Sequence, residues 1–406
     1  MNARVVITGI GIISPYGVGE EVFYKALKEG TSCIKKISLF DVSSFKSQKG
    51  GLITNFLPEE FDNDERFCRL PRIAQYSIVA ADLVMKDIQD AFDSTKIGIF
   101  LGTDHGAIEF TERFYSNLIE KGPERVNPLL FQETVFNAPA SHISLKYKIK
   151  GPTIVITSGY VSGLLSVMQG VDYLQRGKLD LAIVGGIEEL TKTVYEVEYH
   201  LGILSPQDEG EEECRPFDAK RNGFIPSEGA GILLIERLDQ ARKRKAHIYG
   251  EIIGWGNSSD SYKIADYSPE GEGIKNAMLK ALREANLNPE KIDYIAAAAN
   301  GSRVLDRAET KAIKDVFGNY AYKIALSSIK SIVGESSAPS GVFNLIAVLF
   351  SMENNLIPPT INYENYDPEC DLYYVPNIPK RMEVKTGLAN AISFGGNSCS
   401  IIVQKL

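Results

Sequence analysis

Residues 151–175 read GPTIVITSGYVSGLLSVMQGVDYLQ, and this stretch decides the fold class. Its β-branched run TIVITS ends at Gly159, which predicts a buried strand that stops at a turn. From Val161 to Leu174 the apolar residues recur every three or four positions, as they do in an amphipathic helix. The following segment, LDLAIVGG at residues 179–186, predicts another buried strand. This strand–helix–strand order indicates an α/β fold with layered, buried sheets.

The same order of elements recurs along the chain. VVITGIGIIS near the N-terminus and KIGIFLGT predict strands, and EFTERFYSNLIEKG predicts an amphipathic helix. In the second half, the strand KIALSSIK leads through a Gly/Ser-rich loop to the helix GVFNLIAVLFSM. Each half ends in an expected strand–glycine–strand hairpin, GFIPSEGAGILLIERL at residues 223–238 and NAISFGGNSCSIIVQKL at residues 390–406. We therefore expect two copies of one fold, in residues 1–250 and 251–406.

The composition excludes several classes of function. The 406-residue chain is 44% hydrophobic and 24% charged, as is ordinary for a folded globular protein. Its formal charge of −8 argues against non-specific binding to nucleic acid or to a membrane surface. No apolar run predicts a transmembrane helix, and the N-terminus reads as a strand rather than a signal peptide, so we expect a cytoplasmic protein. Five scattered cysteines without CxxC spacing and four dispersed histidines predict neither a metal site nor a cofactor.

Five segments spread over nearly the whole chain carry a family resemblance. They are VVITGIGIISPYG, GPTIVITSG, RPFDAKRNGFIPSEGAGILLIE, SSIKSIVGESSAPSG and SFGGNS. Together they resemble the elongating β-ketoacyl-ACP synthases. The resemblance implies an α/β fold of a particular kind, a duplicated thiolase-like α/β/α/β/α sandwich.

In that family a cysteine nucleophile lies on a sharp strand-to-helix turn, and two histidines assist the decarboxylation of malonyl-ACP. Aligned to the same motifs, this chain has Tyr160 at the nucleophile position and Ala298 and Glu335 at the two histidine positions, whereas Lys330 is retained. A tyrosine of ordinary pKa near 10 is a poor nucleophile for a thioester. Alanine offers no side-chain hydrogen bond, and a glutamate would repel the malonyl carboxylate. All three catalytic groups are therefore expected to be absent.

Within the family, the pattern Ser158-Gly159-Tyr160 is similar to that of chain-length factors of type II polyketide synthases, which pair with an active ketosynthase and serve an acyl carrier protein. These subunits usually carry glutamine where this chain has Tyr160. Two other functions stay open: an acyltransferase or malonyl-ACP decarboxylase with a replaced nucleophile, and a homodimeric acyl-binding protein. Tyr160 either plugs an abandoned pocket or packs against the tunnel of the partner. Lys330 and Glu335 are expected to form a structural ion pair, and Phe394, at the family's gate position, is expected to be simply packed.

The resemblance also implies which residues shape the product and which meet the partner. The residues expected to line the polyketide tunnel and set chain length are Ile108, Thr111, Tyr115 and Val194; the spacing of the first three places them on one face of a helix. That helix can equally be an ordinary amphipathic helix packed on the core. The residues expected at the interface are Phe131, Val135, Phe136, Thr153, Val155 and Thr157.

Overall fold

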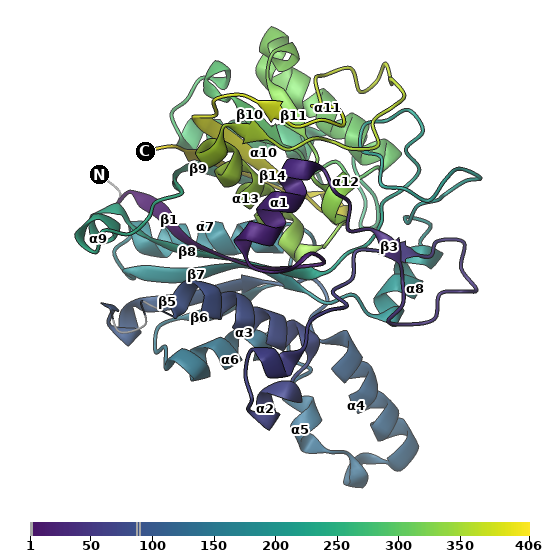
Figure 1. Ribbon diagram of the computed structural model, residues 1–406, viewed down its shortest axis with the longest axis vertical. Coiled ribbons are helices and arrows are strands. Elements are labelled where there is room, and N and C mark those ends of the chain that lie inside the picture. Colours follow the sequence, from purple (N-terminus) through teal and green to yellow (C-terminus); the bar gives the residue numbers. More distant parts are fainter. Residues whose placement is uncertain (1–2, 87, 89–90) are drawn as a thin grey trace.

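The protein is built around one long mixed sheet whose two halves have the same strand order (Figure 1). The computed structural model describes residues 3–86, 88 and 91–406. In the first half the order is β6 (Thr153–Ile156), β5 (Ile97–Gly102), β7 (Leu181–Glu188), β8 (Gly229–Arg237) and β1 (Val5–Ser14). In the second half it is β11 (Ala325–Ser327), β10 (Tyr294–Ala296), β14 (Thr386–Ile392), β15 (Asn397–Gln404) and β9 (Gly250–Ser259).

The direction of the strands repeats as well as their order. In each half the first three strands are parallel and the last two are antiparallel to their neighbours. The two halves meet where β1 pairs antiparallel with β9 over three residue pairs, from Val5 opposite Ile252 to Ile7 opposite Gly250. The expected boundary between residues 250 and 251 therefore falls at the start of β9.

Helices form three layers around these strands. Helices α7 (Ser162–Gln175) and α13 (Ala338–Asn354) share the central core with side chains from both halves of the sheet. Helices α3 (Arg72–Met85) and α6 (Ala138–Tyr147) pack with the outer face of the first half. Helices α10 (Glu272–Glu284) and α11 (Arg303–Phe317) do the same for the second half. The predicted five-layer α/β/α/β/α sandwich is confirmed.

Two glycines let the start of α13 approach the first half closely. A Cβ at Gly163 or at Gly186 would lie 2.3 or 2.4 Å from the carbonyl oxygen of Ala338, which no side chain tolerates. Helix α13 is apolar on all sides, and Ala338 to Met352 are buried without exception, because the helix lies between two sheets. These two glycines therefore determine how closely α13 packs against α7 and β7, and with it the position of the loops at the ends of these elements.

One of the two predicted hairpins is wrong. The segment NAISFGGNSCSIIVQKL does form an antiparallel hairpin, with β14 and β15 joined at Phe394–Gly396. The segment GFIPSEGAGILLIERL instead ends in the single strand β8. Its glycines do not make a turn. A Cβ at Gly231 would lie 3.2 Å from the ring of Phe343, so glycine is present there because α13 packs directly on the strand.

The remaining elements lie around this framework. Helix α4 (Ile108–Lys121) and the short α5 (Pro128–Phe131) extend away from the body of the molecule, and α8 (Lys192–His200) lies at its side (Figure 1). No helix in the described part of the chain is long and apolar enough to cross a membrane. Apart from short 3-10 helices, the other helices and strands of the described residues are β2 (Gly17–Val18), α1 (Glu20–Glu29), β3 (Lys35–Lys36), β4 (Lys49–Gly50), α2 (Glu65–Cys68), α9 (Leu238–Lys243), α12 (Lys330–Val333), β12 (Leu356–Ile357) and β13 (Lys380–Arg381).

Candidate functional site

The turn between β6 and α7 is held by short hydrogen bonds. The Ser162 hydroxyl accepts from the Ser158 backbone N–H at 2.7 Å and donates to the Gly159 carbonyl at 2.6 Å. Gly159 has a φ of +65°, and a Cβ there would lie 2.0 Å from Oγ of Ser393. The Tyr160 N–H donates to that same Oγ at 3.1 Å. The strand-to-helix turn that the sequence predicts is therefore present, and it carries Tyr160.

The side chain of Tyr160 is buried among aromatic residues. It is 4% exposed, and its ring meets Phe394 and Phe224 edge to face, with centroids 5.7 and 6.4 Å away. Its hydroxyl donates to Oε1 of Glu198 at 3.4 Å. Burial raises the pKa of Tyr160 well above its usual value, so the phenol stays neutral near pH 7. A neutral, enclosed phenol cannot act as a thioester nucleophile.

The two positions expected to replace histidines lie beside each other in the second half. Ala298 follows β10, and its backbone rather than its side chain is used: its N–H donates to Oε1 of Glu309 at 2.9 Å, and its carbonyl accepts from Nζ of Lys330 at 2.7 Å. Nζ of Lys330 also lies 2.6 Å from Oε2 of Glu335. Asn300 Nδ2 donates to the same oxygen at 3.0 Å.

The expected Lys330–Glu335 pair is thus formed, and it lies deep in the protein. The two side chains are 2% and 1% exposed. At that depth the carboxylate is compensated by the ammonium group and by one amide, because an unpaired buried charge costs several kcal/mol. The arrangement leaves neither group free to bind the carboxylate of a substrate.

Sequence reasoning missed a cluster of titratable groups next to Tyr160. Asp104 and His105 follow β5, and their N–H groups donate to the carboxylate of Glu188, at the end of β7, at 2.7 and 3.2 Å. Glu198 lies on α8 and has an Oε2 without a hydrogen-bond partner among the described residues. The signal in the sequence was weak. An Asp-His pair directly after a buried strand points to a strand-end site, but the two glutamates are 84 and 94 positions from Asp104 and nothing in their local pattern links them to it.

The environment shifts the pKa of three of these groups upward. Burial raises the pKa of Glu198 to about 8 and that of Asp104 to about 6. Burial also disfavours the charged form of His105, but Glu188, whose Oε1 lies 3.6 Å from Nδ1, raises the pKa of the imidazole to about 9. At pH 7 the cluster therefore holds a neutral Glu198 and a protonated His105. A protonated imidazole cannot take a proton from a nucleophile.

A cleft of about 350 Å³ opens beside Tyr160. Ile108 at the start of α4 and Val194 on α8 line it, together with Phe394 and Glu198. Two of the four expected tunnel residues are therefore brought together. Thr111 is half-buried, with its hydroxyl donating to the Ala107 carbonyl at 2.9 Å, and Tyr115 is 52% exposed; neither lines this cleft. Phe394 is packed between Tyr160 and Tyr267.

The expected interface residues lie on two exposed features. Strand β6 is the last strand of the sheet, so one of its edges is unpaired among the described residues. Ile99 and Thr103 of the β5 segment donate to the carbonyls of Pro152 and Ile156. Because bonding alternates along a parallel strand, the N–H and C=O groups of Thr153, Val155 and Thr157 point to the free edge. The other three residues, on or just after α5, are exposed apolar side chains: Phe131, Val135 and Phe136.

Comparison with known proteins identifies the family. Residues 2–241 match the β-ketoacyl synthase N-terminal domain, and residues 249–364 match the C-terminal domain. This chain belongs to the β-ketoacyl synthase family. It is 33% identical to a 3-oxoacyl-[acyl-carrier-protein] synthase 2 of Coxiella burnetii, over 99% of both chains. It is 35% identical to the protein of that name in Staphylococcus aureus strain N315, over 100% of this chain and 99% of the relative.

Solved structures match over the full length of both chains. The ishigamide ketosynthase/chain length factor superposes with a TM-score of 0.92 at 29% identity. The complex AntDE:AntF, a type II PKS acyl-carrier protein with its ketosynthase bound to the hexaketide, gives a TM-score of 0.90 at 27% identity. A β-ketoacyl synthase from Burkholderia phymatum STM815 gives the same two values. The thiolase-like ketosynthase fold and a role within this family follow from these matches.

Proposed function

We propose that this chain is a non-catalytic chain-length factor, which forms a heterodimer with an active ketosynthase and shapes its polyketide tunnel. The observation that carries the proposal is the state of the three positions where the family has its catalytic groups. Tyr160 is neutral and enclosed, Ala298 contributes only backbone groups, and Glu335 is locked to Lys330. The scaffold around them is intact, so the fold serves a purpose other than chemistry at this turn.

The exposed apolar side chains of the protein favour binding to a partner protein. Helix α4 contains no fully buried residue, although its side chains include Tyr115 and Ile119, the latter 82% exposed. Exposed apolar side chains of this kind are typical of a surface that another protein covers, and the free edge of β6 is a second place where a partner can bind. The ketosynthase/chain length factor and the carrier-protein complex among the structural relatives favour an active ketosynthase as that partner and an acyl carrier protein as the substrate carrier.

A second function, an acyltransferase or malonyl-ACP decarboxylase with a replaced nucleophile, is favoured by the synthase names of the sequence relatives. The hydroxyls near the turn argue against it. Ser162 Oγ is engaged with the backbone of Ser158 and Gly159, and Ser393 Oγ accepts from Tyr160. The imidazole that shares the cleft with Ser393, that of His105, is protonated near pH 7 and cannot act as their base.

Reconstitution separates the two functions. The chain is purified alone and together with a candidate ketosynthase that has the intact Cys-His-His set, and condensation and malonyl-ACP decarboxylation are measured in both preparations. We expect no turnover by the chain alone. The pair should be active, and a Cys→Ala change in the nucleophile of the ketosynthase should abolish its condensation activity. Turnover by the isolated chain that Tyr160→Phe removes would establish the second function instead.

A further inference from the structure

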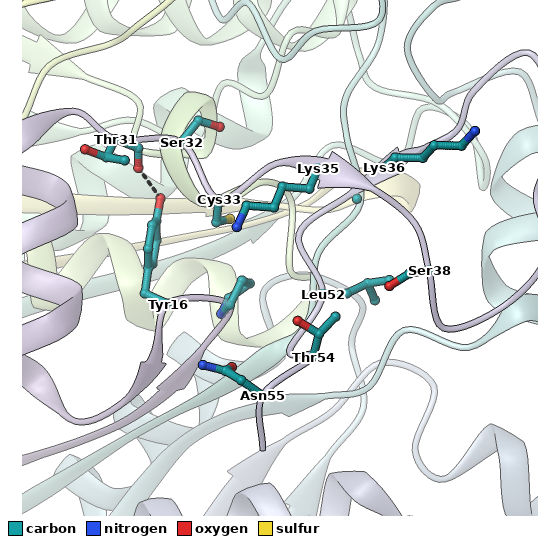
Figure 2. Close-up of a pocket in the computed structure, with 12 residues that line it drawn as sticks. Tyr16, Thr31, Ser32, Cys33, Lys35, Lys36, Ser38, Leu52, Thr54 and Asn55 are labelled. Atoms are coloured by element: carbon teal, nitrogen blue, oxygen red, sulfur yellow. Dashed lines mark hydrogen bonds between the residues drawn. The ribbon is translucent and has the colours of Figure 1, made fainter. Parts of the chain in front are cut away.

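A cavity that shares no lining residue with the cleft beside Tyr160 is lined by polar side chains without a partner among the described residues. Its volume is about 410 Å³, and it lies between the segment after β1 and the β3–β4 region (Figure 2). The side chains of Lys35, Thr31, Ser38, Thr54 and Asn55 line it. None of these five makes a side-chain hydrogen bond or ion pair with another group in the described part of the chain. All five residues are solvent-exposed, so water occupies their donors until a ligand displaces it.

The charge of this cavity is unlike that of the rest of the protein. The chain has a net charge of −8, yet no aspartate or glutamate is among the twelve residues that line the cavity. Two lysines nearby in the sequence have partners: Lys46 pairs with Glu209 at 3.0 Å, and Lys49 donates to the backbone carbonyl of Glu212 at 2.8 Å. Lys35 has no such partner. Its ammonium group is therefore free to compensate the charge of a bound anion.

The orientation of the two neighbouring lysines differs. Figure 2 shows the Lys35 side chain extending toward Cys33 and Tyr16, whereas Lys36 points away from them. Burial raises the pKa of the Cys33 thiol to about 12, so no thiolate competes for the Lys35 ammonium. Of the two lysines that line the cavity, Lys35 is placed to contact a ligand and Lys36 provides a matched comparison.

The wall of the cavity is preformed. The Tyr16 hydroxyl donates to the carbonyl of Thr31 and, at 2.9 Å, to that of Ile332. The Cys33 backbone N–H donates to the same Ile332 carbonyl at 3.0 Å. The backbone of the segment that carries Lys35 is thereby anchored to α12, so this backbone needs little ordering when a ligand enters.

We propose that this cavity binds a small phosphate monoester. A phosphate group presents several oxygens, which suits one ammonium group surrounded by hydroxyl and amide donors. The volume exceeds that of a bare phosphate ion, and Tyr16 and Leu52 supply aromatic and aliphatic surface for an organic group. The proposal concerns a different region from the Tyr160 cleft and does not depend on the chain-length-factor function.

Isothermal titration calorimetry tests the site on the full chain in a phosphate-free buffer at constant ionic strength. The probe is phenyl phosphate, with inorganic phosphate and benzoate as comparisons. We expect saturable 1:1 binding of phenyl phosphate, weaker binding of phosphate, and the weakest binding of benzoate. Lys35→Met should weaken phenyl phosphate binding at least tenfold, and Lys36→Met less than twofold, with unchanged melting temperatures in the absence of ligand.

Three results would overturn the proposal. They are non-saturable heat, benzoate binding as tightly as phenyl phosphate, and equal losses in the two lysine variants. Equal losses would mean that phenyl phosphate is attracted by the positive charge of the surface and does not bind at a defined site. Thr54→Val serves as a second variant, because it removes one donor without changing the charge; an affinity equal to that of the unaltered chain would place the ligand elsewhere. Failure of any of these tests leaves the reconstitution of the heterodimer unaffected.

Discussion

Glu335 is tolerated in the interior because Lys330 and Asn300 reach the same carboxylate oxygen. Lys330→Met would leave a buried carboxylate with a single amide donor. We expect the free energy of unfolding to fall by about 3–5 kcal/mol, the range found when one partner of a buried pair is removed. The double change Lys330→Met with Glu335→Leu should recover most of this loss, since no buried charge remains.

Chemical denaturation measures both variants, and an exposed pair provides the control. Glu65 on α2 and Arg69, directly after this helix, are 2.7 Å apart and largely exposed, so Arg69→Met should cost less than about 1 kcal/mol. A Lys330→Met loss as small as that of the exposed pair would mean that the contact between Lys330 and Glu335 does not stabilise the fold.

Because Glu198 is buried, we expect the stability of the protein to depend on pH. The pKa of Glu198 is raised by burial to about 8 in the folded state, against an ordinary value of 4.5. Between these values the folded protein binds more protons than the unfolded chain, so stability attributable to this group is present below pH 4.5 and is lost as the pH rises to 8. Glu198→Gln removes the titration and keeps an oxygen that can accept from Tyr160.

We therefore expect the stability of Glu198→Gln, relative to that of the unaltered chain, to increase from pH 5 to pH 9 by at least about 1 kcal/mol. Thermal unfolding across this range measures the difference. The control is Glu196→Gln, at a partly exposed position on the same helix that pairs with Lys192 at 3.5 Å. A constant difference between the two proteins at all pH values would show that Glu198 ionises normally.

At the scale of elements, the local pattern of apolar residues predicts helices and strands well. It fails where a residue is required by a contact with a distant part of the chain. Helices α7 and α13 and the strand β1 follow directly from apolar periodicity. The glycines of β8 look like a turn because the contact that requires them, with Phe343, comes from a helix more than 100 positions away. The carboxylates Glu188 and Glu198 escaped the sequence analysis for the same reason: only the fold brings them to His105.

The free edge of β6 yields a test of the interface. The N–H of Val155 points outward, so Val155→Pro removes a donor from the edge and leaves the bonds to β5 intact. We expect this variant to fold but to lose heterodimer formation with the candidate ketosynthase by at least tenfold in affinity. Ile154→Pro is the contrast, because its N–H faces β5 and its loss should destabilise the chain itself. Circular dichroism and size-exclusion chromatography with light scattering measure folding and assembly.

An undiminished heterodimer with Val155→Pro would mean that the partner does not add to this edge. The exposed apolar residues of the α4–α5 region would then have to carry the interface alone. Replacing Phe131, which is on α5, with Ser would distinguish the two surfaces, since it alters no backbone group of β6.

At the scale of the whole molecule, the residues that hold the loops of the site in place differ from those at the positions expected to be catalytic. Glu309 accepts from the N–H groups of Ala298 and Ala299 and from the amide of Asn390, and so keeps the loop that carries Ala298 in place. Asp306 does the same for Asn300 and Phe217. The groups that hold loops are present and those expected to do chemistry are not. This division is what the proposed chain-length-factor function predicts.

The proposed function leads to a prediction for the heterodimer of this chain with a ketosynthase. A tunnel shared by two subunits is shaped by both, so substitutions in this chain should change product length. Ile108 lies at the cleft beside Val194, and Thr111 and Tyr115 follow one and two turns further along α4. If this face closes the tunnel, Ile108→Ala and Tyr115→Ala enlarge the space available to the growing chain and should lengthen the products by at least one extension unit. Thr111→Trp fills the same space and should shorten them.

The measurement is the mass distribution of products from each reconstituted pair. Glu112→Ala is the matched control, since Glu112 is exposed and one position from Thr111 along the same helix. Truncating a fully buried large side chain costs about 2–5 kcal/mol, but Ile108 is only partly buried, so heterodimers should persist and their presence is checked by light scattering. Unchanged lengths in all three variants, with intact heterodimers and an acylated partner cysteine, would mean that α4 only packs at the interface and that the tunnel ends on other residues.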